Sequence, residues 1–302
     1  MRLYGNRAKT IAWLVLILSL CVITISGARL WEEWQVYREG DDSYQRLAET
    51  VRLNAPAVQQ AAVNAGSPLG EGGGTVTGEA GEQAQAAAGP DASITSIAPA
   101  DRVKPFRPRV AVPDLYIDFE TLQAVNKDAA AWLYNPGTAI DYPVMRATDY
   151  DYYLHHLPNR SANANGTLFI DYNWTDFSDR LTVIYGHNMR SGKMFGSLSE
   201  YKRQAYFNEH PYMYLYTADG GNFRVDLLYG CVIGAGQWRQ RAFMFEENLD
   251  SLLAYAEHNT TFVSKAVYEP GDRVIALSTC SYEFDNARYV VLGVLRPEYA
   301  GD

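Results

Sequence analysis

The stretch Arg273–Leu295 reads RVIALSTCSYEFDNARYVVLGVL and contains two apolar, β-branched runs separated by a short polar loop. Such runs are typical of β-strands, and the short connection predicts an antiparallel hairpin. Cys280 closes the first predicted strand and Arg288 opens the second, so both are expected at the same end of the sheet. A guanidinium beside a thiol favours the reactive thiolate and can bind an oxyanion formed there.

Another predicted strand, Leu181–Tyr185, is followed by Gly186 and His187. The glycine permits a turn, and an imidazole just beyond a strand end can act as a general acid and base. A lone cysteine, histidine or arginine usually has a structural role. Together at matching strand ends, these residues favour nucleophilic catalysis, with Cys280 as nucleophile, His187 as acid and base, and Arg288 as oxyanion ligand.

The chain after about residue 110 is dense in aromatic and β-branched residues. Turn signals such as Asp219–Gly221 and Pro270–Asp272 separate short apolar runs. Helical spacing is found in Phe119–Val125 and Glu246–His258. The remaining strands are expected at Thr167–Asp171, Tyr212–Thr217 and Asn222–Val232. Many short strands with few helices predict a mainly β fold, a barrel or a sandwich decorated by helices.

The apolar segment Ile11–Ala28, IAWLVLILSLCVITISGA, carries no charge and is just long enough to cross a hydrocarbon core. Arg2, Arg7 and Lys9 precede it, which by the positive-inside rule places the N-terminus in the cytoplasm and the rest of the chain outside. A cleaved signal peptide is the alternative, although Ile25–Ala28 is a weak cleavage site. We therefore expect a cell-membrane protein with a cytoplasmic tail over 1–10 and one uncleaved transmembrane signal-anchor over 11–28.

Residues 29–53 are polar and charged, and their pattern predicts a stalk helix that continues the membrane helix. The larger side chains at helical spacing are Trp34, Tyr44, Leu47 and Val51. Residues 54–105 are rich in Ala, Gly, Gln, Pro, Ser and Thr and cannot bury enough apolar surface to offset the entropy of ordering. We expect a flexible linker there, followed by a folded catalytic domain over 106–302.

The net charge of −9 arises after Val110, because the chain before it carries equal numbers of acidic and basic residues. An acidic domain argues against a nucleic-acid partner. It is compatible with an amine-bearing partner, although a solvated acidic surface is the simpler interpretation. Cys21, Cys231 and Cys280 form no disulfide framework, and a single Cys231–Cys280 bridge stays open as an alternative to free thiols. We find no metal-ligand spacing and no phosphate-binding glycine loop, so no metal and no cofactor are expected.

Several motifs then resemble a known family. Leu277–Cys280, Tyr185–Met189 and the Arg288 strand look like the sortase signature. The segments that resemble class B sortases in particular are Trp132–Val144, Asp151–Leu154, Gly166–Asp171 and Lys193–Leu198. The resemblance covers about Val112–Leu295. It implies an eight-stranded sortase-type β-barrel with added helices, Glu246–His258 among them, and a Gram-positive cell envelope.

The resemblance also implies an activity, that of a cysteine transpeptidase. Such an enzyme would cleave a C-terminal sorting signal of a secreted protein after threonine and form a thioacyl intermediate at Cys280. It would then pass the protein to an amine of a lipid-linked peptidoglycan precursor. A pilin-polymerising sortase, which uses a protein lysine as the amine, is the first alternative. A catalytically inactive, membrane-displayed binding protein is the second and less favoured one.

The resemblance finally indicates a substrate groove. The residues that fall where the family lines this groove are Leu154, Tyr185, Ser278 and Thr279. Tyr150, in the run TDYDYYL, stands where many class B members have asparagine, so the familiar sorting-signal preference does not carry over. Glu283 and Asp285 lie in the loop between Cys280 and Arg288. We interpret them as solvated carboxylates rather than as an acidic partner of the catalytic residues.

Overall fold

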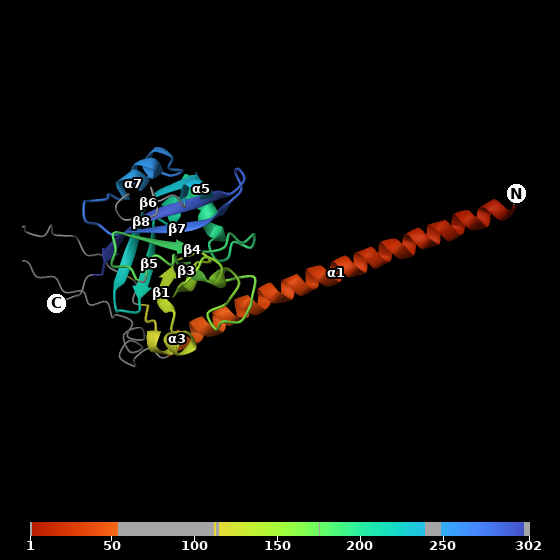
Figure 1. The fold of residues 1–302 in the computed structure, drawn as a ribbon, viewed down its shortest axis with the longest axis horizontal. Helices are drawn as coiled ribbons and strands as arrows, with labels where there is room; N and C mark the ends of the chain where they lie inside the picture. Colours follow the sequence, from red (N-terminus) through yellow and green to blue (C-terminus); the bar gives the residue numbers. More distant parts are fainter. Residues whose placement is uncertain (1, 54–111, 113–114, 175, 239–248, 299–302) are drawn as a thin grey trace, which may run out of the picture. The chain divides into compact units, whose positions relative to one another are not determined.

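The computed structural model describes residues 2–53, 112, 115–174, 176–238 and 249–298. Within these ranges the chain forms a long N-terminal helix, a β-barrel, and short helices around the barrel (Figure 1). The predicted linker over 54–105 and the first residues of the predicted catalytic domain lie outside the described residues.

The strands of the described residues close into an eight-stranded barrel in the order β1-β2-β3-β4-β7-β8-β6-β5, which confirms the predicted fold class. The strands are β1 Ala129–Tyr134, β2 Asp141–Arg146, β3 Leu168–Ile170, β4 Leu181–Tyr185, β5 Tyr212–Thr217, β6 Asn222–Gly234, β7 Val274–Ser281 and β8 Ala287–Pro297. The α-helices are α1 Arg2–Leu53, α3 Phe119–Val125, α4 Gln204–Glu209, α5 Ala235–Trp238 and α7 Leu249–His258. Two 3-10 helices are η1 Tyr152–Leu154 and η2 Gly196–Lys202.

Strand direction in the barrel brings separate chain segments to one rim. β4 and β7 are parallel, so their carboxyl ends lie at the same rim, and Tyr185 at the end of β4 pairs with Ser278. β8 runs antiparallel to β7, and its first residues return to that rim. The pairing therefore gathers the end of β4, the end of β7 and the beginning of β8 in one place.

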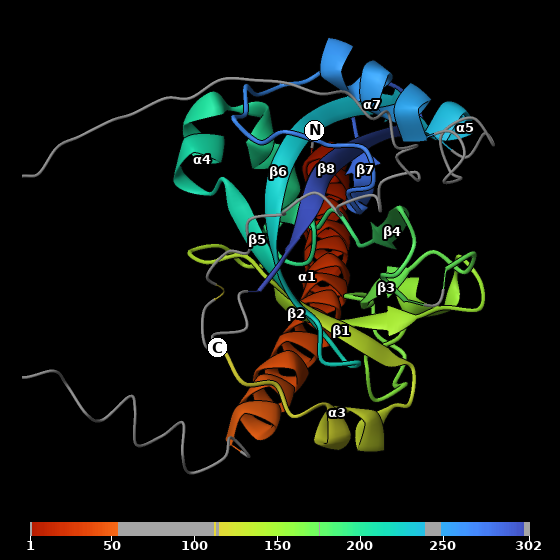
Figure 2. The ribbon, with the colours of Figure 1, turned by 90° about the vertical axis from the view of Figure 1, so that its left-hand side faces the viewer.

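The barrel core is built from apolar strand residues. Nearly every residue of β7 is buried, as expected for a continuous apolar strand that is covered on both faces. α7 packs against β6 and buries Leu249, Leu252, Leu253 and Ala256, the face that its spacing predicts. Each fully buried leucine contributes about 1.5–3 kcal/mol to the free energy of folding. In Figures 1 and 2, α5 and α7 lie at the opposite end of the barrel from α3.

α1 is one uninterrupted helix that begins at Arg2, runs through the apolar segment and ends on the barrel. From Trp13 to Leu30 its large apolar side chains are exposed, and this part has the length and hydropathy of a candidate membrane span. Further along, Tyr44 is buried, and its hydroxyl donates a hydrogen bond to the carbonyl of Gly166. Trp34, at the predicted helical spacing, is instead 52% exposed.

The middle of α1 docks on the loop that precedes β3. The side-chain amides of Asn163 and Asn165 donate to the backbone carbonyls of Val36 and Tyr37, at 2.8 and 3.1 Å. Gly40 makes this approach possible, because a Cβ at that position would lie 2.3 Å from Nδ2 of Asn165. Hydrogen bonds therefore fix the helix to the barrel, and they require a residue without a side chain at Gly40.

The C-terminal end of α1 is held by β2 and α3. Arg52 forms an ion pair with Asp141 at 2.6 Å. The backbone amide of Asp118 donates to the carbonyl of Val51 at 3.0 Å, and the Asp118 side chain caps α3 through the amide of Thr121 at 2.9 Å. Figure 2 shows α3 beside this end of α1.

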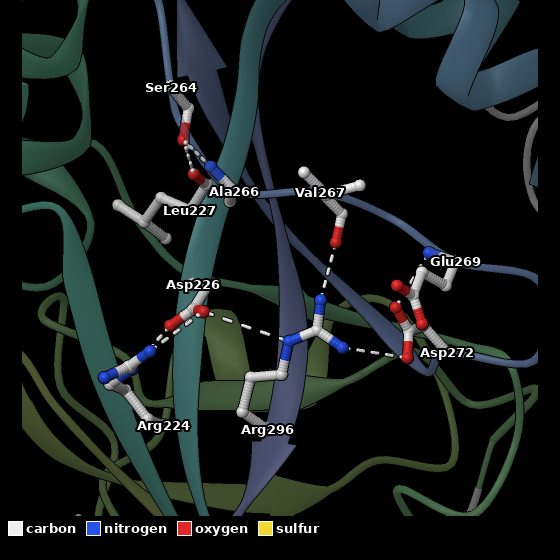
Figure 3. Close-up of polar contacts among 9 residues, drawn as sticks. All are labelled: Arg224, Asp226, Leu227, Ser264, Ala266, Val267, Glu269, Asp272 and Arg296. Atoms are coloured by element: carbon white, nitrogen blue, oxygen red, sulfur yellow. Dashed lines mark hydrogen bonds and ion pairs between the residues drawn. The ribbon is translucent and has the colours of Figure 1, made fainter. Parts of the chain in front are cut away.

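A charge network joins β6, β8 and the segment before β7 (Figure 3). Arg296 lies 2.9 Å from a carboxylate oxygen of Asp272 and 3.8 Å from one of Asp226. Asp226 also pairs with Arg224 at 2.6 Å. Asp272 is fully buried and Arg296 is one of its partners, so removing Arg296 would take away part of what compensates a buried charge. The network thus fixes the chain where it enters β7.

The structure differs from the predicted elements mainly at β1 and β2, which were not predicted as strands. β1 begins with three alanines and β2 contains Pro143, neither of which favours a strand. Pairing between β1 and β2, and between β1 and the distant β5, holds them in the barrel. β7 and β8 reach one residue closer to the connecting loop than predicted, to Ser281 and Ala287. Glu246, the predicted start of a helix, lies outside the described residues.

Candidate active site

Cys280 and Arg288 are directly opposite each other in the hairpin of β7 and β8. Opposite residues of an antiparallel pair lie on the same face of the sheet, with Cβ atoms about 4.5–5.5 Å apart. Both side chains are half-buried. The arrangement leaves a thiol and a permanently charged guanidinium on one face of the rim.

Three hydrogen bonds hold the segment that carries His187 against the end of β7. They run from Gly186 N to Ser278 O at 3.3 Å, from Thr279 Oγ1 to Gly186 O at 2.8 Å, and from Asn188 Nδ2 to Cys280 O at 2.7 Å. A Cβ at Gly186 would lie 2.4 Å from Leu168 Cδ2, so a larger residue could not pass so close to β3. The position of His187 thus depends on local bonds to the strand that carries Cys280.

The His187 ring is half-buried, and its Nε2 lies 2.8 Å from the carbonyl oxygen of Leu154. A carbonyl only accepts hydrogen bonds, so we assign the proton to Nε2. Nδ1 is then the basic nitrogen of the neutral ring. An imidazole fixed through one nitrogen and basic at the other can accept a proton and return it.

A small pocket of about 90 Å³ connects these residues. Its lining includes every residue that the sequence pointed to for the site: Tyr150, Leu154, Tyr185, His187, Ser278, Thr279, Cys280 and Arg288. Trp238 and Phe169 also line it, and the sequence did not indicate them. Phe169 lies within the GTLFID motif, whereas Trp238 carries no sequence signal for a site.

An aromatic cluster forms one wall of the pocket. Tyr150 packs edge-on against Tyr172 and Tyr185, with ring centroids 4.7 and 5.8 Å apart. The hydroxyl of Tyr185 donates to a carboxylate oxygen of Asp171 at 3.0 Å, and Asp171 is fully buried. Burial and the nearby Asp171 carboxylate raise the pKa of Tyr150 and Tyr185 above the ordinary value. Both hydroxyls therefore stay protonated and able to donate.

No family model matches the chain. A sortase B of Listeria monocytogenes is 34% identical to it over 184 residues, which span 59% of this chain and 74% of that protein. The chain belongs to the class B sortases. A sortase B of Staphylococcus aureus is 24% identical over 178 residues. Membership makes the protein a sortase-type cysteine transpeptidase, as the motifs predicted.

Solved structures of other class B sortases have the same barrel. The Clostridium perfringens sortase B matches with a TM-score of 0.54 and 30% identity, over 59% of this sortase and 98% of that chain. A Streptococcus pyogenes class B sortase involved in pilus biogenesis matches with a TM-score of 0.53 and 24% identity. The second likeness supports the fold alone.

The three thiols of this sortase differ in their surroundings. All are free, so the alternative of a Cys231–Cys280 bridge is not realised. Cys231 is buried in the core, and burial raises the pKa of its thiol to about 12. Cys280 is half-buried at the rim. Only a thiol that can ionise and meet a substrate can act as a nucleophile, so Cys231 is unsuited to that role.

The loop between β7 and β8 contains the two carboxylates considered from the sequence. Glu283 forms an ion pair with Lys202 and accepts a hydrogen bond from Ser281. Burial alone would raise the pKa of Glu283, but the bonds from Lys202 and Ser281 lower it overall. Asp285 is exposed. Glu283 therefore tethers the loop to η2.

Proposed function

We propose that this sortase cleaves a C-terminal sorting signal after threonine and transfers the secreted protein to an amine of a lipid-linked peptidoglycan precursor. The observation that carries the proposal is the single pocket lined by Cys280, His187 and Arg288. Belonging to the class B sortases supports a transpeptidase chemistry at this pocket.

In the proposed first half-reaction, the Cys280 thiolate attacks the carbonyl carbon of the threonine in the sorting signal. Arg288 stabilises the negative oxygen that forms, since its guanidinium is always charged. His187, which takes the thiol proton onto Nδ1 when the Cys280 thiolate forms, gives that proton to the leaving amine as the peptide C–N bond breaks. A thioester between Cys280 and the threonine remains.

In the second half-reaction, a primary amine attacks the thioester carbonyl. The new C–N bond forms and the C–S bond breaks, which regenerates the Cys280 thiolate. His187 takes the proton that the amine nitrogen loses. The cycle needs no redox partner.

For the sorting signal we propose the pocket residues Leu154, Tyr185, Ser278, Thr279 and Tyr150 as the binding groove. The Ser278 hydroxyl is buried and has no hydrogen-bond partner in the described part of the chain, so a substrate backbone group can satisfy it. The Thr279 hydroxyl already donates to Gly186 O, so it positions the rim. Tyr150 narrows the groove with an aromatic ring and is expected to shift the preferred signal toward residues that pack on its face.

We further propose that the candidate span of α1 anchors the enzyme in the cell membrane, with residues 1–10 in the cytoplasm and the barrel outside. The support is the exposed apolar surface of α1 and the basic residues that precede it. The domain division is then a tail, an anchor over 11–28, a stalk over 29–53, a linker over 54–105 and the catalytic domain.

The test uses the full-length chain in phospholipid nanodiscs and a fluorogenic peptide library with a fixed threonine and randomised neighbours. We expect the enzyme to cleave a subset of peptides after the threonine. Cys280→Ala, His187→Ala and Arg288→Ala should each abolish cleavage, whereas Cys21→Ser should not change it. Full activity of Cys280→Ala would contradict the proposal. Adding triglycine or an Nα-acetyl-lysine amide as the acceptor then compares the rates of transfer to two amines. The first is a peptide amine, and the second is the lysine amine that a pilin polymerase would use.

A further inference from the structure

A second cleft, which His187 also lines, lies between α1 and the catalytic rim. Its volume is about 860 Å³, and Tyr282 of the β7–β8 loop forms part of its lining. The rest comes mainly from one face of α1 and from the segment after β4, through Glu33, Trp34, Tyr37, Arg38, Asp41, His187, Asn188, Met189, Arg190, Ser191 and Lys193. His187 lines both this cleft and the small pocket of Cys280. A molecule in the larger cleft would therefore contact the same histidine as the sorting signal.

The walls of this cleft combine flat aromatic surfaces with charges of both signs. Trp34, Tyr37 and Tyr282 are 52%, 41% and 78% exposed, unusual for large aromatic side chains. The guanidinium of Arg38 lies 5.1 Å from the centre of the Trp34 ring. Arg190 adds a second exposed cation. Such a lining suits a ligand that carries an anionic group together with a compact polar body.

Charged side chains of both signs also line the cleft where α1 docks on the barrel. Lys193, which follows His187 in the same segment, forms an ion pair with Asp41 of α1. Glu33 lies on α1 toward the apolar segment. Glu33 and Asp41 line the same cleft as His187, so these carboxylates can attract an incoming ammonium group, and the arginines can hold an anion.

The cleft is also close to the apolar part of α1. Its residues on α1 begin at Glu33, three positions after Leu30, which belongs to the run of exposed apolar residues that starts at Trp13. With a rise of 1.5 Å per residue, Glu33 to Asp41 lie about 5 to 17 Å beyond that point along the helix axis. If the apolar segment spans the membrane, the cleft opens at the height of lipid headgroups and their attachments.

We infer that this cleft binds the acceptor, a peptide amine carried by a phosphate-linked membrane lipid. The inference rests on the proposed transpeptidase function and adds where the second substrate sits. The amine enters past Glu33 and Asp41 and attacks the thioester carbonyl at Cys280, forming the C–N bond and releasing the thiolate. His187, which faces both cavities, receives the proton from the amine nitrogen. Arg38 and Arg190 bind the phosphate, and Trp34 packs on the body between phosphate and amine.

The experiment uses the full chain in nanodiscs with a peptide donor selected from the library. Two acceptors carry the same amine: free triglycine, and triglycine attached to the phosphate headgroup of a phospholipid in the same bilayer. We expect Trp34→Ala and Arg38→Ala each to raise the KM for the lipid-linked acceptor at least fivefold. Trp31→Ala and Arg46→Ala, exposed residues of the same helix outside the cleft, are the matched controls and should leave that KM unchanged.

A binding measurement separates this inference from the proposed function. Cys280→Ala cannot form the thioester, so its Kd for nanodiscs that contain the lipid-linked triglycine reports on the cleft alone. We expect Arg38→Ala in the Cys280→Ala background to weaken that binding by a similar factor. The acceptor site would be overturned if the cleft variants and their controls bound the lipid-linked acceptor equally and had the same KM for it. The proposed function would survive that result as long as the wild type cleaves the donor peptide. Absence of donor cleavage by the wild type would instead overturn the proposed function, and the acceptor role with it.

Discussion

The side-chain amide of Asn188 donates a hydrogen bond to the backbone carbonyl of Cys280, with 2.7 Å between nitrogen and oxygen. The bond connects the segment after β4 to the end of β7, two parts of the chain that the parallel pairing of those strands brings together. Because His187 precedes Asn188, the bond also holds the segment that carries the imidazole against the strand that carries the thiol. Asn188 is thus a positioning residue for the proposed reaction.

We expect Asn188→Ala to lower kcat about 10- to 100-fold with little change in the KM for the donor, since small misplacements of reacting groups are costly. The control is Asn259→Ala, which removes a similar amide-to-carbonyl bond, to Tyr255, on the remote helix α7. Steady-state kinetics and thermal unfolding of both variants provide the comparison. An equal loss of activity in the two variants would assign Asn188 a merely structural role.

A thiol reagent should modify Cys280 and leave Cys231 unmodified in the folded protein. A pKa of about 12 leaves Cys231 almost entirely as the thiol at pH 8, and burial excludes reagents, whereas Cys280 reaches the surface. In a Cys21→Ser background we expect a methanethiosulfonate reagent to label the peptide that contains Cys280 and not the one that contains Cys231. Mass spectrometry of the digested protein measures this. Preferential labelling of Cys231 in the folded protein would contradict the structure.

The docking of α1 should tolerate no side chain at Gly40. Alanine would favour the helix by about 1 kcal/mol, but its Cβ would displace the Asn165 amide and break a buried hydrogen bond. We expect Gly40→Ala to lower the free energy of unfolding by up to about 2 kcal/mol in net terms. Gly27→Ala is the matched control, because nothing lies within 4 Å of a Cβ there. Urea unfolding in detergent distinguishes the two, and a stabilised Gly40→Ala would refute the close approach.

The β7–β8 loop should loosen in acid. The pKa of Glu283 is lowered in the folded protein, so the ion pair with Lys202 contributes fully above the ordinary value of 4.5 and is lost as the pH falls through the depressed value. Hydrogen exchange of residues 281–287, corrected for the intrinsic rate, should rise below about pH 4.5. Lys202→Ala should show the faster exchange already at pH 7, whereas Lys265→Ala, an exposed lysine elsewhere, should behave as the wild type.

The sequence predicted the parts of the fold that local patterns specify. The hairpin of Cys280 and Arg288 follows from two strong strands and a short loop, and both residues occupy the predicted places. β1 could not be recognised, because AAAWLY has a weak strand pattern and gains its stability from pairing with β5 about eighty residues away. Long-range pairing of this kind leaves little trace in the local sequence.

The same limit applies to the site. Cys280 and His187 are chemically reactive residue types at strand ends, so their positions alone suggested a role. Trp238 and Asp171 reach the pocket or its wall only through the closed barrel, and Asn188 matters through a bond to a backbone carbonyl. Asp171 and Asn188 lie within the motifs Gly166–Asp171 and Tyr185–Met189, but the motifs alone did not indicate what either side chain does. Nothing in the local sequence distinguishes Trp238.

The continuity of α1 from the apolar segment to Gly40 has a geometric consequence. An α-helix turns about 100° per residue, so the number of residues between the two points sets the azimuth of the catalytic rim around the helix axis. Inserting one residue would rotate the rim by more than a quarter turn, whereas inserting seven would nearly restore its direction and only raise it by about 10 Å. Insertions or deletions in this segment therefore keep the direction of the catalytic rim only when they add or remove nearly whole helical turns.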